Sequence, residues 1–204
     1  MRGFHTMFLG AALALAGTGP AHAALNDGVL NDEAVAVEAA AAGLAPNKFV
    51  WADTGTAEPL TVVVSIPLQR AFVYRGNAMV AASTVSTGTD DKPTPTGVFP
   101  ILQKAEKHTS NLYGSSMPFM QRLTWDGVAL HAGRNPGFPA SHGCVRLPAA
   151  FAKKLFEVTD VGTTVVVTDS IFVEATLDPE LLRNDAARAN EAQLAALEPS
   201  APVE

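Results

Sequence analysis

The sequence gathers its chemically reactive side chains in nineteen residues, Leu130 to Pro148, which read LHAGRNPGFPASHGCVRLP. This stretch holds the chain's only cysteine, Cys144, together with His131 and His142. A cysteine attacks as its thiolate, so a nucleophilic cysteine needs a base and an electropositive setting. His131 is a candidate base, and Arg146 supplies a positive charge two residues after the cysteine. The spacing therefore indicates a cysteine nucleophile suited to acyl transfer.

The four residues Ser141-His142-Gly143-Cys144 resemble a tight turn. A glycine before the cysteine lets the backbone come close to a substrate. The amides of Gly143 and Cys144 are then candidates for an oxyanion hole, in which each donor is typically worth about 3 kcal/mol.

Two other interpretations use the same residues. His131, His142 and Cys144 could bind zinc, but a structural zinc site needs a fourth ligand, and the sequence offers neither a further Cys/His cluster nor an HExxH helix. Alternatively, Cys144 is buried and inert and the histidines only satisfy local hydrogen bonds. A single cysteine excludes an intramolecular disulfide. The combination of these residues in one short stretch favours the catalytic interpretation.

The elements that must position these residues are mostly short strands. β-branched and alternating runs separated by turn residues predict a mainly β domain with one or two short helices. A mixed polar stretch from 104 to 121 has no clear period and predicts a functional loop. The expected strands are 60–66, 70–74, 78–85, 98–103, 123–125, 128–131 and 163–168, and the expected helices are 35–42, 148–158 and one starting at 178.

The ends of the chain have a different composition. Arg2, the apolar run from Met7 to Ala16 and the Ala21-His22-Ala23 site predict a secretory signal peptide over residues 1–23. A retained N-terminal anchor is the alternative. Residues 24–57 form an alanine-rich segment, and residues 170–204 predict a helix and a disordered tail. The mature protein is expected to lack a transmembrane segment, and its net charge of −6 argues against nucleic acid as a partner.

The residues from His131 to Gly133 and the following SHGCVRLP resemble the signature of L,D-transpeptidases with a YkuD-type catalytic domain. The upstream segments LTVVVSIPLQRAFVYRGNAMVAASTVSTG and TPTGVFPI are similar to the first strands of that domain, so the resemblance covers about residues 58–169. It implies a β-sandwich-like catalytic fold and a transferase of peptidoglycan biosynthesis, which shapes the cell wall. Its substrates would be peptidoglycan stem peptides, it would need no cofactor, and it would act in the periplasm or cell wall.

The resemblance also implies roles for single residues. Cys144 would be the nucleophile, and His131 the proton donor and acceptor, oriented by a backbone carbonyl. His142 and Gly143 would form the oxyanion turn, and Arg146 and Ser141 would bind substrate. An L,D-carboxypeptidase or endopeptidase with the same site and a non-catalytic wall-binding module are the alternatives. The span between His131 and Ser141 is shorter than in many members, which predicts a smaller wall beside the site.

Overall fold

The computed structural model describes residues 32–53, 55–172, 174, 176–177 and 182. The signal peptide predicted over 1–23 lies outside these residues, as does nearly all of the helix predicted from 178. Of the helices within the described residues, none combines the length and apolar character that a bilayer span requires.

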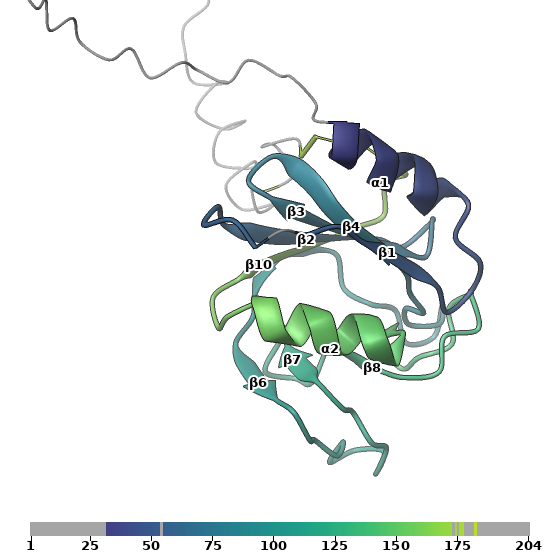
Figure 1. The fold of residues 1–204 in the computed structure, drawn as a ribbon. Helices are drawn as coiled ribbons and strands as arrows, with labels where there is room; N and C mark the ends of the chain where they lie inside the picture. Colours follow the sequence, from purple (N-terminus) through teal and green to yellow (C-terminus); the bar gives the residue numbers. More distant parts are fainter. Residues whose placement is uncertain (1–31, 54, 173, 175, 178–181, 183–204) are drawn as a thin grey trace, which may run out of the picture.

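Two β-sheets and two helices make up the described chain, which confirms the predicted mainly β fold (Figure 1). The larger sheet has the strand order β1-β4-β3-β2-β10-β5, and the smaller has the order β6-β7-β8-β9. The elements are α1 (Asp32–Ala42), β1 (Phe49–Trp51), β2 (Leu60–Ser65), β3 (Arg70–Arg75), β4 (Ala78–Thr84), β5 (Gly97–Pro100), β6 (Gln103–Ala105), β7 (Met120–Arg122), β8 (Ala129–Ala132), β9 (Val145–Leu147), α2 (Ala149–Val158) and β10 (Thr164–Thr168).

The central strands of the larger sheet are buried on both faces, which explains their nearly continuous apolar runs. Successive side chains on a strand point to opposite faces. Val62 and Val64 of β2 therefore join the main core with the smaller sheet and α2, whereas Val63 packs on the other face. On that second face α1 buries Val37 and Ala41. Figure 1 shows α1 covering the larger sheet on one side and α2 lying on the other.

The sequence predicted one strand over 98–103, and this was wrong, because the chain changes sheets there. β5 ends at Pro100, which has no N–H to donate to a ladder. The next amide, that of Ile101, still bonds Thr163 beside the larger sheet, but the Leu102 amide bonds Arg122 of the smaller one. The fully buried Ile101 side chain fills the core between the two sheets.

The strand predicted at 123–125 was also wrong. These residues enter a turn in which the Leu123 and Thr124 amides both bond the Val128 carbonyl, and the real strand is β7, just upstream. The three-residue strands β1, β6, β7 and β9 were not predicted, because three residues are too short for a periodic signal. Residues 104–105 of β6 and 120–121 of β7 fall in the stretch that the sequence predicted as a loop. The remaining strands and both helices lie where the sequence placed them, within a few residues.

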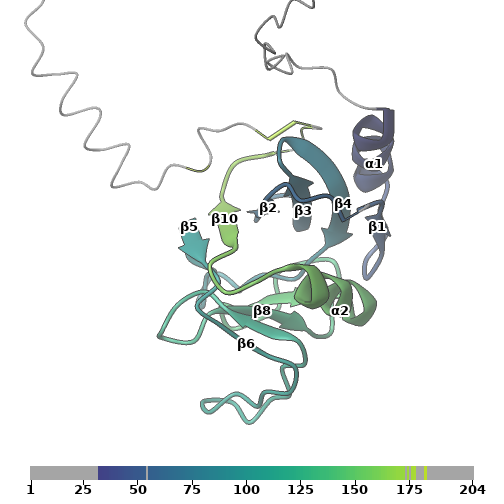
Figure 2. The same ribbon diagram turned by 60° about the vertical axis from the view of Figure 1, so that its left-hand side comes forward.

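The connection between β6 and β7, residues 106–119, extends away from the two sheets (Figures 1 and 2). A backbone bridge between Thr109 and Ser116 closes it as a loop. Its base is held beside α2, since the Lys104 ammonium donates to the Phe156 and Thr159 carbonyls at the C-terminal end of that helix.

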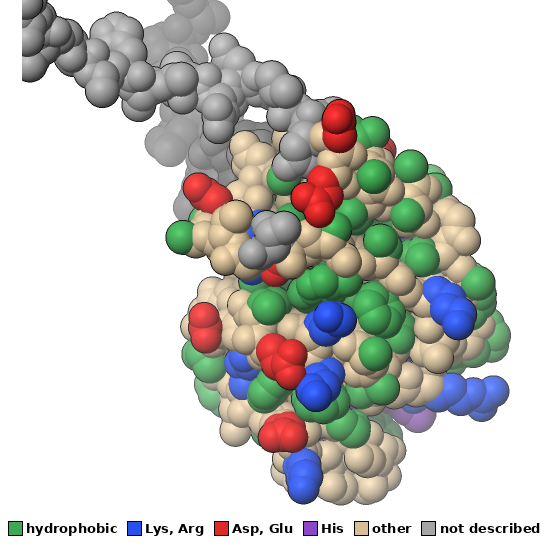
Figure 3. Space-filling view, viewed as in Figure 1, with side chains coloured by type: hydrophobic (Ala, Val, Ile, Leu, Met, Phe, Trp, Pro, Cys, Tyr) green, Lys and Arg blue, Asp and Glu red, His purple; other side chains and the backbone are tan. Residues whose placement is uncertain are grey.

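On the face shown in Figure 3, acidic and basic side chains are interspersed over α2.

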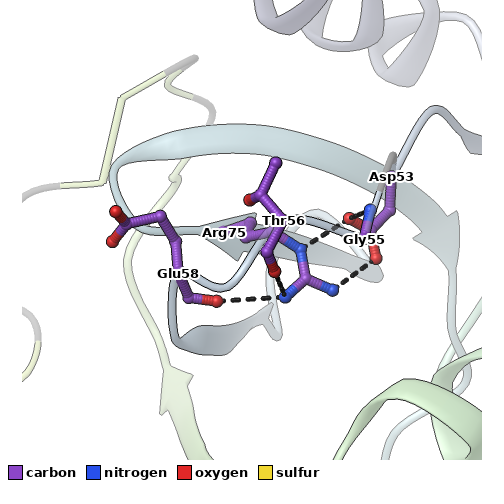
Figure 4. A network of polar contacts seen from close by, with 5 residues as sticks. All are labelled: Asp53, Gly55, Thr56, Glu58 and Arg75. Atoms are coloured by element: carbon purple, nitrogen blue, oxygen red, sulfur yellow. Dashed lines mark hydrogen bonds and ion pairs between the residues drawn. The ribbon is translucent and has the colours of Figure 1, made fainter.

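A buried ion pair joins the segment after β1, residues 53 and 55–58, to the end of β3. The Arg75 guanidinium donates to both carboxylate oxygens of Asp53, at 2.6 and 2.7 Å, and to the Thr56 and Glu58 carbonyls (Figure 4). The Asp53 side chain is 2% exposed. The hydrogen bond from Arg75 holds the pKa of Asp53 below its ordinary value of 3.8, against the effect of burial, and the Gly55 amide lowers it further.

We predict that Asp53→Asn lowers the free energy of unfolding by about 1–3 kcal/mol at pH 7, because it removes charge-assisted hydrogen bonds to a buried guanidinium. Since folding depresses the pKa of Asp53, this contribution is complete above about pH 4 and is lost as the pH falls further. Urea denaturation of both proteins at pH 7 and pH 3 measures the difference, which should shrink at pH 3.

Glu157→Gln is the matched control, because Glu157 pairs with Lys153 at 3.8 Å on the exposed face of α2. Exposed pairs contribute little, so its effect should stay within about 0.5 kcal/mol. Equal effects of the two variants would contradict a stabilising role of the Asp53–Arg75 pair.

Candidate active site

The register of the smaller sheet places the reactive side chains on one face. β8 and β9 are parallel, with His131 paired to Arg146, so both side chains leave the sheet on the same side. Their neighbours Leu130, Val145 and Leu147 point the other way, into the core. Cys144 immediately precedes β9 and therefore lies at the end of the strand that borders His131.

These residues open into a cleft of about 890 Å³, a size typical of small-molecule sites. It is bordered by residues 91–95, by the 106–119 loop and by the turn from 125 to 129. All six residues that the sequence singled out line it: His131, Ser141, His142, Gly143, Cys144 and Arg146.

The His131 ring is oriented by the backbone. Its Nδ1 lies 2.9 Å from the Ala132 carbonyl, which can only accept, so Nδ1 carries the proton and Nε2 is left as the basic nitrogen. Burial lowers the pKa of His131, and the charge of Arg146 lowers it further, against the opposing hydrogen bond to Ala132. The ring is therefore neutral near pH 7 and able to take a proton.

The surroundings of Cys144 favour the neutral thiol over the thiolate. Burial raises the pKa of the Cys144 thiol, while a backbone hydrogen bond at Ala129 and the charges of Arg146 and Arg122 oppose the rise. Its Sγ lies 3.5 Å from the Gly127 carbonyl, which accepts from the thiol. With His131 neutral, the arrangement is a thiol and a free base rather than a resting ion pair.

The Ser141 side chain holds the turn before Cys144. The Gly143 amide donates to Ser141 Oγ at 3.1 Å, and Ser141 Oγ donates to the Cys144 carbonyl. Gly143 has φ +113°, a conformation that other residues adopt only with strain. The Gly143 amide, expected from the sequence as an oxyanion donor, is thus occupied. Among the described residues, no partner is found for the Cys144 amide.

A segment that the sequence did not single out, residues 85–94, supports this turn from the larger sheet. Thr94 Oγ1 accepts from the Gly88 amide and donates to the Gly143 carbonyl, each at 2.9 Å. Gly88 has to be glycine, because a Cβ there would lie 2.0 Å from the Lys92 carbonyl oxygen. The Thr87 carbonyl accepts from the Ala140 and Ser141 amides.

The buried Gln69 side chain fixes that segment in turn. Its amide oxygen accepts from the Thr87 amide at 3.0 Å, and its amide nitrogen donates to Thr87 Oγ1 at 2.7 Å. Buried side-chain amides with both ends paired hold a loop in one conformation. No local sequence signal marks Gln69 or Thr94 as a support of the turn, because Thr87 and Gly143, the partners that matter here, lie 18 and 49 positions further along the chain.

Two exposed aromatic residues border the cleft. Tyr113 and Trp125 line it, and the Tyr113 ring stacks on the exposed His142 ring at 4.6 Å between centroids. Phe119 instead packs on Phe156 of α2, and Phe138 lies outside the lining. The stack joins the 106–119 loop to the turn that carries Cys144.

The zinc interpretation finds no support. Within the described part of the chain, no three His, Cys, Asp or Glu side chains are close enough together to hold a metal ion. The site has instead a thiol, a neutral imidazole and the guanidiniums of Arg122, Arg134 and Arg146, a set suited to acyl transfer to and from sulfur.

Comparisons with known proteins agree with a site for acyl transfer to and from sulfur. The family model for the L,D-transpeptidase catalytic domain, YkuD, matches residues 59–167. The chain therefore belongs to the YkuD family of L,D-transpeptidase catalytic domains, as its motifs predicted. No curated protein sequence matches the chain.

Solved structures show the same fold. An L,D-transpeptidase (Yku) from Stackebrandtia nassauensis is 29% identical with a TM-score of 0.51, covering 56% of this chain and 58% of that one. The L,D-transpeptidase LdtMt1 in complex with imipenem is 25% identical with a TM-score of 0.53, covering 55% and 60%. An L,D-transpeptidase from Mycobacterium smegmatis is 22% identical with a TM-score of 0.50, covering 53% and 58%. The chain thus spans less than two thirds of the length of these structures.

We predict that Thr94→Val destabilises the protein by about 1–3 kcal/mol, because it leaves the buried Gly88 amide and Gly143 carbonyl without their partner. Denaturant unfolding measures the change. Thr96→Val, at an exposed position two residues further on, should change the free energy of unfolding by no more than about 0.5 kcal/mol. If Thr94→Val were as stable as the wild type, Thr94 would not hold the turn.

The pKa directions predict how alkylation of Cys144 depends on pH. Only the thiolate reacts, and burial raises the pKa of the thiol, so the rate with iodoacetamide should climb through pH 7 to 9 without a plateau. The measurement is the loss of free thiol over time by intact-mass spectrometry. A rate already constant between pH 6 and 8 would show a resting thiolate–imidazolium pair instead.

Proposed function

We propose that the protein is an L,D-transpeptidase that acts on peptidoglycan stem peptides through a thioester on Cys144. One observation carries the proposal: in a chain of this family, the only cysteine and a neutral, backbone-oriented His131 share one cleft. The cleft is large enough to take a peptide of a few residues.

The reaction begins when His131 Nε2 accepts the proton of the Cys144 thiol as the sulfur attacks the carbonyl of the third stem residue. The carbonyl becomes a tetrahedral oxyanion. His131 then donates that proton to the amine of the departing terminal D-residue, and a thioester remains on Cys144. An acceptor amine attacks the thioester, its proton passes to His131 and then to the leaving sulfur, and the new amide is released.

The Cys144 amide is the oxyanion donor that the turn offers. The Gly143 amide is held by Ser141 Oγ, so it joins only if that bond opens when substrate binds. We assign Ser141 to holding the turn rather than to contacting substrate. His142, stacked on Tyr113, borders the acyl site, and Arg146 faces the substrate beside His131.

A carboxypeptidase uses the same residues with water in place of the acceptor amine, and it is the second candidate. The cleft, with a volume of about 890 Å³, has room for an acceptor amine beside the bound donor peptide, which favours transpeptidation. A non-catalytic binding module would have no use for an oriented base beside a buried thiol.

The proposed place of action is outside the cytoplasm, in the periplasm or cell wall, because the substrate is there. The signal peptide predicted over residues 1–23 agrees with this proposal.

The test is incubation of the mature protein with a disaccharide-tetrapeptide, with products identified by mass spectrometry. We expect a cross-linked dimer, lost entirely in Cys144→Ala and reduced by at least about 100-fold in His131→Ala, since general base catalysis contributes that much. Tripeptide without dimer would establish the carboxypeptidase.

Thermal unfolding of each variant is the control for folding. His131 contributes one hydrogen bond, to a neighbouring carbonyl, so His131→Ala should keep most of its stability. Loss of fold in step with loss of turnover would make His131 a structural residue, and no turnover by folded wild-type protein would contradict the proposed function.

A further inference from the structure

Arg122, at the end of β7, lies on the reactive face of the smaller sheet. It pairs with Ala129 in the antiparallel ladder, two positions before His131 on β8. Residues two apart on a strand share a face, so Arg122 and Arg146 flank His131 from the two neighbouring strands. Arg122 also lines the cleft, and it is half-buried.

Among the residues that the structure describes, no carboxylate forms an ion pair with either guanidinium. The ion pairs found within the described residues are Asp53–Arg75 and Lys153–Glu157, and neither involves Arg122 or Arg146. The one side-chain partner found there for Arg122 is neutral: its Nε donates to Gln103 Oε1 at 3.1 Å. Asp91 and Asp126 also line the cleft, but the ion pairs of the described residues join neither of them to Arg122 or Arg146. Two half-buried guanidiniums left without a paired carboxylate favour the binding of an anion from outside.

Both charges act on the nucleophile's surroundings. The guanidiniums of Arg146 and Arg122 each favour the charged form of Cys144, which places them within electrostatic reach of the sulfur. An anion bound between them would therefore lie beside the bond that the sulfur attacks.

We propose that Arg122 is a substrate-binding residue that forms, with Arg146, a two-guanidinium site for a carboxylate next to the scissile bond. Guanidinium forks match carboxylates in bidentate geometry, which fixes the orientation of the bound group as well as its position. The inference rests on the proposed function for the identity of the substrate, but not for the binding of a carboxylate beside Cys144.

The first experiment compares alkylation of Cys144 by iodoacetate and by iodoacetamide. Both reagents attack the same thiolate, so the ratio of their rates cancels the thiolate fraction and reports only on binding of the reagent's carboxylate. We expect the wild-type ratio to exceed that of N-acetylcysteine by at least about tenfold, the size of one charge-assisted hydrogen bond. It should fall several-fold as the salt concentration rises.

Arg122→Gln should lower the ratio by about tenfold, and Arg122→Lys, which keeps the charge but loses the fork, by less. The control Lys153→Gln removes an exposed positive charge on α2 and should leave the ratio unchanged. A ratio unchanged in Arg122→Gln, or insensitive to salt in the wild type, would overturn the proposal. Because the salt series uses only wild-type protein, the test stands even if a variant folds poorly.

Two peptide substrates then identify the carboxylate. A tetrapeptide with its terminal carboxyl converted to the amide tests the leaving D-residue, and one with the diamino acid's carboxyl amidated tests the third residue. If the amidated group is the carboxylate that Arg122 binds, that substrate should have a raised KM with the wild type. Arg122→Gln and the wild type should then have the same KM for it. If Arg122→Gln costs the same with every substrate, Arg122 does not bind a substrate carboxylate. Inactivity on all peptides with an intact alkylation ratio would contradict the proposed function alone.

Discussion

The pairing of β8 with β9 is the constraint on which the site depends. In a parallel pair, partners across the ladder point to the same side, so the pairing of His131 with Arg146 fixes which side chains face the cleft. A shift of one residue would turn His131 into the core and Leu130 outward. The buried side chains of Leu130, Val145 and Leu147 oppose such a shift, so the hydrophobic core sets the register that turns His131 and Arg146 toward the cleft.

The same packing decides the electrostatics. Because the smaller sheet lies close to the core, Cys144 and His131 are largely withdrawn from water, and burial disfavours the charged form of each. Near pH 7 the thiol is therefore protonated and the imidazole neutral. The charges of Arg122 and Arg146 favour the thiolate. In the proposed mechanism, the charges of the thiolate and the imidazolium would form only when the sulfur attacks.

Support for the turn before Cys144 comes from the other sheet. Thr94 joins Gly88 to Gly143, and Gln69 fixes the segment that accepts the Ser141 amide. Each of these hydrogen bonds gives a backbone group a protein partner in place of water. Since the site lies where the two sheets meet, its geometry depends on the intact fold, and a loop alone would not hold Cys144 at a fixed distance from β8.

The sequence by itself determined the mainly β class, both described helices, the longer strands and the grouping of Cys144, His131 and Arg146, which line one cleft. These features rest on local periodicity and on residue types within one short stretch. The sequence missed β1, β6, β7 and β9 and predicted one strand over 98–103, since three-residue strands and a change of sheet at Pro100 are decided by partners distant in the chain. Only the tertiary structure placed Arg122 beside His131 and gave the Gly143 amide a partner. Those outcomes depend on strand register and burial, which residue types alone do not fix.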